Sequence, residues 1–323
     1  MLNCFVPEPH GLTRLDPAPA VVPEHCLWVD LVEPTLDEEK SVEQFLAIDV
    51  PTREEMKEIE ASNRLYEEDG ALYMTATVVT KIDTERPESS AITFILVRNK
   101  LITNRYSDPL PFRRFIAYAE RHSSVCGSAT TVLAGLLESI IERIADVLER
   151  VGSDLDELSA GVFAPPRRRK TVTRDLRAVM ERIGRGGDLT SKARESLVTL
   201  GRLLSFVQQS SSVNLSGDLR SRFRTLTRDV QALSDHASFV ANKLTFMLEA
   251  TLGLINIEQN NIIKIFSVAA VVFLPPTLIA SIYGMNFQHM PELEWYVGYP
   301  FAVVLMVISA ILPYVYFKRR GWL

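Results

Sequence analysis

The sequence predicts an α/β domain, followed by a long helix that continues into a membrane region of two helices. Three observations predict this order. Strand-like and helix-like patterns alternate over about the first 120 residues, the pattern is helical from Ala129 onward, and two uncharged apolar runs of about 20 residues lie near the C-terminus. The 323-residue chain has a net charge of −5, but segment 262–323 carries four Lys or Arg and only two Glu. An acidic, water-soluble part is therefore joined to a short apolar part.

The N-terminal α/β part is indicated by short apolar runs between turn and cap residues. Strand-like runs cover residues 27–34, 71–79 and 91–106. Thr35, with Glu38 three residues later, forms a capping box that predicts the start of a helix, and Thr52 and Glu55 repeat the signal. The third run is expected to fold as a hairpin about residues 99–100. The first two dozen residues are left unassigned.

Motifs for catalysis or cofactor binding are missing from this part. The sequence contains no G-x-G-x-x-G, Walker A, G-x-S-x-G or H-E-x-x-H pattern. Cys4, Cys26 and Cys126 are far apart and odd in number, which excludes a disulfide framework and a zinc-binding spacing. We therefore expect no enzyme activity, no organic cofactor and no nucleic-acid partner.

The helical region that follows contains one strongly acidic helix. Its acids are Glu138, Glu142, Asp146, Glu149, Asp154, Asp156 and Glu157. A break at Pro165–Pro166 precedes four basic residues at 167–170, and a serine-rich interruption covers residues 210–216. Two alternatives stay open for the acids: they pair with basic residues of a neighbouring helix or subunit, or they form a solvated face.

A repeat of 3.5 residues runs through the next helix. Its positions are Leu219, Phe223, Leu226, Val230, Leu233, Ala237, Val240, Leu244, Met247, Thr251 and Leu254. A repeat held this long is typical of a helix that packs against other helices along its length. No turn separates it from the first apolar run, so we expect one helix from about Leu219 to Gly284, roughly 100 Å long.

Two apolar runs are long enough to span a membrane. The predicted membrane segments are residues 262–284 and 297–317, with a connection at 285–296 and a tail at 318–323. The basic tail Lys318–Arg320 places both termini in the cytoplasm by the positive-inside rule. The alternative is two unusually apolar core helices of a soluble protein. The predicted divisions of the whole chain are 1–128, 129–261 and 262–323.

Small, neutral and partly polar side chains follow one face of the first apolar run. Continuing the repeat places these residues together. They are Asn260, Ser267, Leu274 and Ser281, with Ile263, Ala270 and Thr277 beside them. In a membrane such a face packs against other helices or, with several copies around an axis, lines a pore. Pro275 and Pro276 remove two backbone donors and are expected to bend or loosen this helix, as in an ordinary packing kink.

The apolar runs contain no carboxylate, which argues against tight binding of a bare cation or a proton relay. Mg²⁺ dehydrates reluctantly, so neutral amide and hydroxyl oxygens that contact its hydration shell form a sensible filter.

The residues at the end of the first run carry a family resemblance. Tyr283–Phe287 (YGMNF), followed by Met290–Leu293 (MPEL), resembles the signature of CorA-type magnesium transport proteins. Resembling segments also cover residues 58–74, 94–105, 257–287 and 313–323, so the likeness extends from about Trp28 to the C-terminus.

The resemblance implies a homopentameric funnel in the bacterial inner membrane, whose long stalk helix continues as the pore helix. It implies influx of hydrated Mg²⁺, and also of Co²⁺ or Ni²⁺, driven by the membrane potential. Five copies of Asn286 would accept hydrogen bonds from the waters around Mg²⁺, on a turn shaped by Gly284 and Met285. For Asn286 alone, a helix C-cap is the plainer alternative. By the family pattern, Thr277 supplies a pore hydroxyl, and Asn260, Ile263, Phe266 and Leu274 form the inner pore and its constriction.

Acidic residues supply two further hypotheses. Glu292 and Glu294 would concentrate cations at the outer mouth, or are simply solvated loop residues. The resemblance also implies closure by cytoplasmic Mg²⁺ bound between subunits. The sequence shows no matching motif for that site, so Asp229, Asp235 and Glu249 are candidates only.

Two alternatives to a magnesium channel are open. One is the zinc-transporting ZntB-like branch of the same architecture, whose signature has Val in place of Met285. The other is a membrane-anchored coiled-coil sensor or scaffold that moves no ion.

Overall fold

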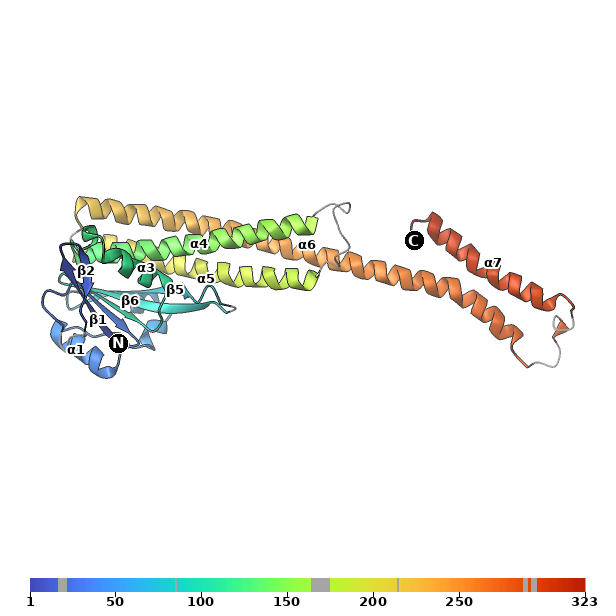
Figure 1. The fold of residues 1–323 in the computed structure, drawn as a ribbon, viewed down its shortest axis with the longest axis horizontal. Helices are drawn as coiled ribbons and strands as arrows, with labels where there is room; N and C mark the ends of the chain where they lie inside the picture. Colours follow the sequence, from blue (N-terminus) through green and yellow to red (C-terminus); the bar gives the residue numbers. More distant parts are fainter. Residues whose placement is uncertain are drawn as a thin grey trace. The chain divides into compact units, whose positions relative to one another are not determined.

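The computed structural model describes residues 1–16, 22–84, 86–163, 175–213, 215–286, 290–291 and 295–322. They form two compact units, Met1–Met247 and Leu248–Leu323, and the longest helix begins in the first unit and ends in the second (Figure 1). The strands are β1 (Leu2–Glu8), β2 (Gly11–Arg14), β3 (Trp28–Val32), β4 (Leu65–Glu68), β5 (Ala71–Thr80), β6 (Glu88–Val97) and β7 (Lys100–Arg105). The helices are α1 (Leu36–Leu46), α2 (Ala61–Arg64), α3 (Leu110–Ala119), α4 (Ala129–Phe163), α5 (Leu176–Gln209), α6 (Gly217–Tyr283) and α7 (Gly298–Arg319), with short 3₁₀ turns at Glu55–Lys57 and Ser123–Val125.

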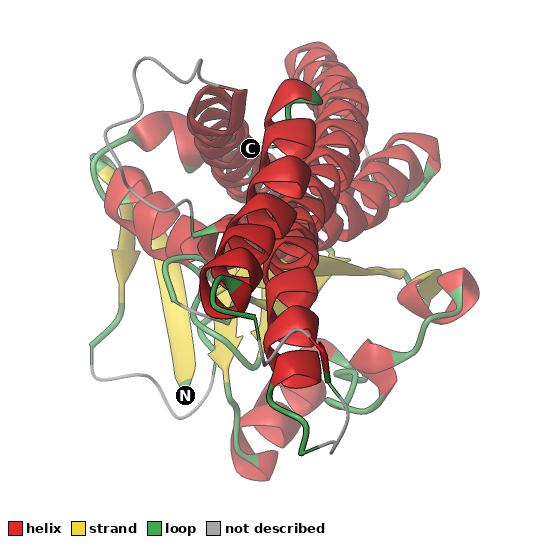
Figure 2. Cartoon of the chain, turned by 90° about the vertical axis from the view of Figure 1, so that its right-hand side faces the viewer, coloured by secondary structure: helices red, strands yellow, loops and turns green. Residues whose placement is uncertain are grey.

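The strands, yellow in Figure 2, form one mixed sheet in the order β2-β1-β3-β7-β6-β5-β4. Strands β3 and β7 are parallel neighbours, and all other pairs are antiparallel. Strands β1 and β2 come from the N-terminal residues that the sequence left unassigned. The predicted alternation of strands and helices is confirmed, with three more strands than expected, the third being the edge strand β4.

Side chains of the central strands alternate between two separate cores. On one face, Met74, Phe94 and Leu101 join a cluster with residues of α3, α4, α5 and α6. On the other face, Tyr73 and Ile95 pack with residues of α1. Because successive side chains of a strand point to opposite faces, strands buried on both faces read as continuous apolar runs rather than as an alternating pattern.

The hairpin between β6 and β7 turns one residue earlier than predicted. Val97 pairs with Lys100, so Arg98 and Asn99 make the turn, and Arg98 has a φ of 55°. The Asn99 side chain then accepts a hydrogen bond from the backbone N–H of Ala129, at 3.2 Å, and so caps the start of α4.

Only the first of the two capping signals starts an α-helix. At the first, Thr35 Oγ1 accepts from the N–H of Glu38 (3.3 Å), and Glu38 accepts from the N–H of Thr35 (2.9 Å). The second, at Thr52, makes the equivalent bonds to Glu55 but starts only the 3₁₀ turn Glu55–Lys57. A local cap supplies hydrogen bonds, but a full helix also needs an apolar face to bury.

Replacing Thr35 by alanine is expected to destabilise α1 by about 1 kcal/mol, since one helix N–H loses its acceptor. Hydrogen exchange of the α1 amides then accelerates about fivefold. Thr52→Ala is the matched control and leaves α1 unchanged. Equal exchange in the wild type and Thr35→Ala contradicts the capping assignment.

The repeat on α6 is buried as predicted. Phe223, Leu226, Val230, Ala237, Val240, Leu244, Met247 and Thr251 are each 5% exposed or less. The break between α5 and α6 falls in the serine-rich segment, also as predicted. The predicted break at Pro165–Pro166 and the basic residues 167–170 lie outside the described residues.

The acidic residues of α4 pair with basic side chains from other elements. Arg182 of α5 contacts Glu157 at 2.9 Å, and Lys243 of α6 contacts Asp156. Glu138 pairs with Arg222 of α6, and Asp146 with Arg114 of α3. These pairs form within one chain, and the four acids are still 43–74% exposed, so they are both paired and accessible to solvent.

The second unit holds two apolar stretches, on α6 and α7. Their mean hydropathy reaches 2.2 and 2.1 over 18 residues, and only 6% of each stretch is buried. A core helix of a soluble protein would be mostly buried, so both helices suit a membrane rather than a soluble core. Helix α6 ends at Tyr283 and α7 covers Gly298–Arg319, close to the predicted membrane segments.

Candidate pore-lining surface

One side of the apolar part of α6 packs inside the chain. From Ile262 to Tyr283, Val268 is buried, 4% exposed. The partly buried residues of this stretch are Val272, Pro275, Pro276, Ile279 and Tyr283. At about 100° per residue, all six fall within an arc of about 100°. Intramolecular packing therefore occupies one face of the helix.

The predicted lining residues occupy the other side. Asn260, Ile263, Phe266, Ser267, Ala270, Leu274, Thr277 and Ser281 are all exposed. They lie between about 110° and 170° from the centre of the packed arc. The single chain thus leaves open the face that the sequence assigned to a pore.

This open face is mixed in character. Ile263, Phe266 and Leu274 are 61%, 72% and 66% exposed, and their apolar side chains are equally compatible with contact with lipid. Asn260, Ser267, Thr277 and Ser281 are the polar members of the set. Polar side chains inside a membrane face other helices or water, so the polar members favour contact with a partner helix or a water-filled path.

The hydroxyl of Thr277 already donates a hydrogen bond within its own helix. Thr277 Oγ1 lies 2.7 Å from the carbonyl oxygen of Phe273. The hydrogen is thereby used, and the lone pairs of Oγ1 are left to accept. Pro275 and Pro276 lack an N–H, so the carbonyls four residues earlier, at 271 and 272, lose their usual helical donors. This part of α6 is therefore rich in hydrogen-bond acceptors, the groups that suit the waters of a hydrated cation.

The backbone at the C-terminal end of α6 explains why residue 284 is a glycine. Gly284 N–H donates to Ala280 O at 2.9 Å, and Met285 N–H to Ile282 O at 3.2 Å. A Cβ at position 284 would lie 3.1 Å from the Ala280 oxygen, so a side chain there would crowd the last turn. Asn286 follows, exposed, and is not one of the described non-glycine residues with positive φ. A left-handed C-cap therefore does not account for it.

Other predicted site residues are less well placed. Glu292 and Glu294 lie outside the described residues. Asp229, Asp235 and Glu249 are exposed on α6, and Asp235 accepts a 3.4 Å hydrogen bond from Gln231. Within the described part of the chain, no three His, Cys, Asp or Glu side chains come together as a metal site.

Helix α7 presents small residues on its packed side. Gly298 and Ala302, four residues apart, are buried, as is typical of close helix packing in membranes. At its other end Lys318 lies over the ring of Tyr314 (6.0 Å) and Arg320 over Tyr316 (5.6 Å). Basic and aromatic side chains are typical of a membrane–water interface.

Comparison with known proteins gives one consistent relationship. Residues 23–319 match the family profile described as CorA-like Mg²⁺ transporter protein. The chain is 36% identical over 323 residues to the magnesium transport protein CorA of Escherichia coli (strain K12), and equally to that of Salmonella typhimurium (strain LT2), with 100% of each chain covered.

Solved structures share the fold at low sequence identity. The complete CorA magnesium transporter of Methanocaldococcus jannaschii gives a TM-score of 0.78 at 21% identity, covering 100% of this chain and 99% of that one. The ZntB cytoplasmic domain of Vibrio parahaemolyticus gives 0.58 at 11% identity, covering 79% of this chain and 97% of that one.

Proposed function

The chain belongs to the CorA-like Mg²⁺ transporter family, and from this premise we propose that it carries Mg²⁺ across a membrane through a pore lined by α6. The observation that carries the proposal is the open face of α6: its acceptor-rich residues end at Gly284-Met285-Asn286, in a chain related over its full length to magnesium transport proteins. Neutral acceptors suit an ion that keeps its water shell.

The pore requires several copies of the chain. In a homopentamer, five open faces of α6 would surround one axis, and five Asn286 amides would ring its outer end. Asn260, Ser267, Thr277 and Ser281 would contact hydrated Mg²⁺ in sequence, through weak bonds that allow passage. Ile263, Phe266 and Leu274 would form an apolar constriction that closes by losing its water.

The membrane potential supplies the driving force in this proposal. A divalent cation that enters a cell at −100 mV gains about 4.6 kcal/mol. The basic residues Lys318–Arg320 at the C-terminal end of α7 favour the cytoplasmic side, so both termini would lie in the cytoplasm of a bacterial inner membrane. Co²⁺ and Ni²⁺, similarly hydrated, are expected to compete for the same path.

The proposal includes closure of the pore by intracellular Mg²⁺. The candidate acids Asp229, Asp235 and Glu249 are exposed on α6 and are available to carboxylates of another copy. Substituting each by Lys is expected to change how internal Mg²⁺ closes the pore, if the site lies there.

Uptake by proteoliposomes tests the function. With a negative internal potential, the reconstituted chain is expected to admit Mg²⁺, and external Co²⁺ is expected to slow the uptake. Uptake of Zn²⁺ in preference to Mg²⁺ would support the ZntB-like alternative, which the comparisons support less. No uptake of either ion above that of empty liposomes would support the non-conducting scaffold.

Replacing Thr277 by valine keeps the shape of the side chain and removes its acceptor. We expect Mg²⁺ uptake to fall about two- to tenfold, which corresponds to a net loss of about one hydrogen bond between the waters of the ion and the ring of five residues. Thr245→Val is the matched control, because Thr245 Oγ1 makes the same kind of bond, to Ala241 O at 3.1 Å, outside the apolar part of α6. Equal uptake by both variants contradicts a pore role for Thr277.

A further inference from the structure

Helix α5 contains an unusual glycine cluster in its interior. Gly184, Gly186 and Gly187 fall within four residues of a 34-residue helix. Relative to alanine, each glycine in a helix interior favours local opening by about two- to fivefold. This part of α5 is therefore the weakest point of the helix.

Packing explains only one of the three glycines. A Cβ at Gly186 would lie 3.2 Å from Leu244 Cδ2 and 3.4 Å from Val151 Cγ1, so α4, α5 and α6 approach closely there. A Cβ at Gly184 or Gly187 would meet nothing within 4 Å, and the same holds for Gly152 of α4. Alanine would fit at these three positions and would make the helices stiffer.

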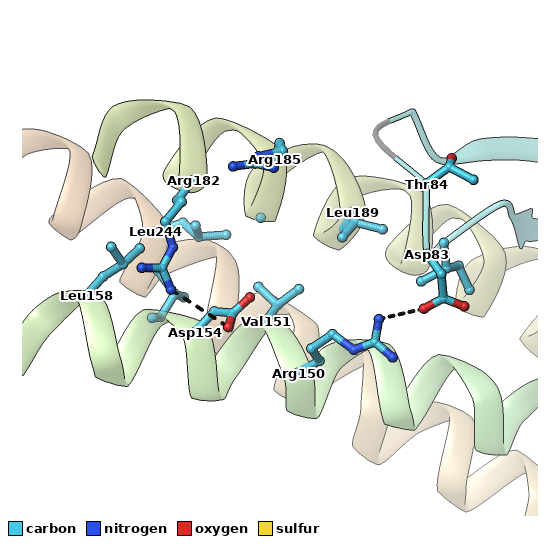
Figure 3. A pocket seen from close by; sticks show the side chains of 13 residues that line it. Asp83, Thr84, Arg150, Val151, Asp154, Leu158, Arg182, Arg185, Leu189 and Leu244 are labelled. Atoms are coloured by element: carbon cyan, nitrogen blue, oxygen red, sulfur yellow. Dashed lines mark hydrogen bonds and ion pairs between the residues drawn. The ribbon is translucent and has the colours of Figure 1, made fainter. Parts of the chain in front are cut away.

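A cavity lies at the same level of the helices. It has a volume of about 380 Å³ and is lined by residues 150–158 of α4, 182–189 of α5, Leu244 of α6 and the β5–β6 connection (Figure 3). Its lining includes Val151 and Gly186, which make the close approach described above. Of the four glycines only Gly186 lines this cavity, while a Cβ at Gly152, Gly184 or Gly187 would meet nothing within 4 Å, so a bend at these three positions meets little steric resistance.

The main hydrophobic core stops just before this level. Its last members toward the cavity are Leu148 on α4 and Ala193 on α5. Beyond the glycines lie residues 153–163 of α4 and 176–183 of α5, which we call the distal arm. Its buried residues, such as Leu155 and Ile183, are not part of that core. Segments outside the main core open at a lower free energy than the core itself.

Partly exposed ion pairs link the two helices of the arm. Arg182 of α5 contacts Glu157 of α4 at 2.9 Å and Asp154 at 3.9 Å. Across the cavity, Arg150 and Arg143 hold Asp83 of the β5–β6 connection at 2.7 and 2.9 Å. The hydrogen bond from Arg150, and then the charge of Arg143, lower the pKa of Asp83. The part of α4 that contains Arg143 and Arg150 is therefore linked to the sheet domain, while the distal arm has its own internal ion pairs.

Besides its buried apolar residues, such as Leu155 and Leu158, which line one cavity with Leu244 of α6, the distal arm makes two half-exposed contacts with α6. Lys243 pairs with Asp156, whose side chain is 73% exposed. Phe246 stacks on Phe163 with ring centroids 6.2 Å apart, and the two residues are 58% and 54% exposed. Exposed ion pairs are weak and are screened by salt, so these contacts open easily.

We propose that the distal arm pivots as one body at the glycines of α5 and at Gly152, and that the Lys243–Asp156 and Phe246–Phe163 contacts form a latch that holds it on α6. Opening the latch frees this part of α6 from one of its lateral supports. The proposal concerns the motion of the arm and stands whether or not the chain carries Mg²⁺.

Hydrogen exchange on the full-length protein tests the hinge. In Gly184→Ala/Gly187→Ala, exchange in both halves of the distal arm is expected to slow about five- to thirtyfold. Gly201→Ala is the matched control: Gly201 lies in α5 outside the arm, a Cβ there would lie 3.4 Å from Val230 Cγ1, and the change is expected to leave the arm unchanged. Equal slowing in the control, or slowing of the α5 half alone, would overturn the proposal.

The same measurement tests the latch. Lys243→Gln, or added salt, is expected to speed exchange of the arm severalfold. Lys192→Gln is the control, since Lys192 pairs with Asp188 of its own helix, and it leaves the arm unchanged. Unchanged exchange of the arm in Lys243→Gln overturns the latch.

Discussion

Replacing Asn286 by alanine is expected to lower Mg²⁺ uptake by about two orders of magnitude. In the proposed pentamer the change removes five amides that accept hydrogen bonds from the waters of one ion. A hydrogen bond to a charged partner contributes about 1.5–3 kcal/mol, so losing even two of these weaker, water-mediated bonds has an effect of this size. The fold is expected to stay intact, because Asn286 is exposed in the single chain.

Asn261→Ala supplies the matched control for this experiment. Asn261 lies on α6 and, by helical spacing, on the side of Val268 rather than on the open face. Uptake is measured in proteoliposomes with equal amounts of protein and the same imposed potential. Wild-type uptake by Asn286→Ala, or an equal loss in both variants, contradicts the role of Asn286 at the pore mouth.

Removing the carboxylate of Asp30 is expected to destabilise the sheet domain strongly. Arg105 Nη2 lies 2.9 Å from Asp30 Oδ2 and Nε lies 3.0 Å from Oδ1, with the side chains 4% and 0% exposed. Thr103 Oγ1 also donates to Asp30, at 2.7 Å. Asp30→Ala leaves the guanidinium without its buried partner, which costs about 3–5 kcal/mol.

Thermal unfolding of the purified protein measures this loss. For a unit of this size the expected decrease in Tm is about 6–20 °C. Asp108→Ala is the control, because Asp108 also contacts Arg105, at 3.0 Å, but is 51% exposed. Its expected cost is below about 1 kcal/mol. Similar decreases in Tm in both variants would contradict the claim that burial of the Asp30–Arg105 pair makes Asp30 important for stability.

Periodicity predicted most of the fold, and each element that it missed or misplaced has a specific structural reason. The repeat from Phe223 to Thr251 predicted the buried side of α6, because helix spacing alone decides which residues share a face. Strand β1 (Leu2–Glu8) was missed because it contains Pro7 and is recognisable only by its pairing with β2 and β3. The hairpin at Arg98–Asn99 was shifted because Asn99 also caps α4, a contact that no local pattern reveals.

The candidate site was predicted in part from spacing and in part from resemblance. Asn260, Ser267 and Ser281 followed from the repeat. Phe266 breaks the small, neutral pattern and Asn286 lies beyond the helix end, so only the family signature indicated them. For the regulatory site the sequence offered only the candidates Asp229, Asp235 and Glu249, because such a site depends on contacts between copies of the chain that no local pattern reveals.

The central claim is that the open face of α6 lines the path of the ion, and thiol accessibility tests it most directly. Single cysteines are placed on that face, at Ala270 and Ser281, and on the packed face, at Val272 and Ile279. Cys126 is replaced by serine in every variant, since Cys4 and Cys26 are already buried. We expect a water-soluble thiol reagent to block Mg²⁺ uptake by the variants with a cysteine at position 270 or 281. Uptake by the variants with a cysteine at position 272 or 279 is expected to continue. Block at 272 and 279, or at none of the four positions, would contradict the claim.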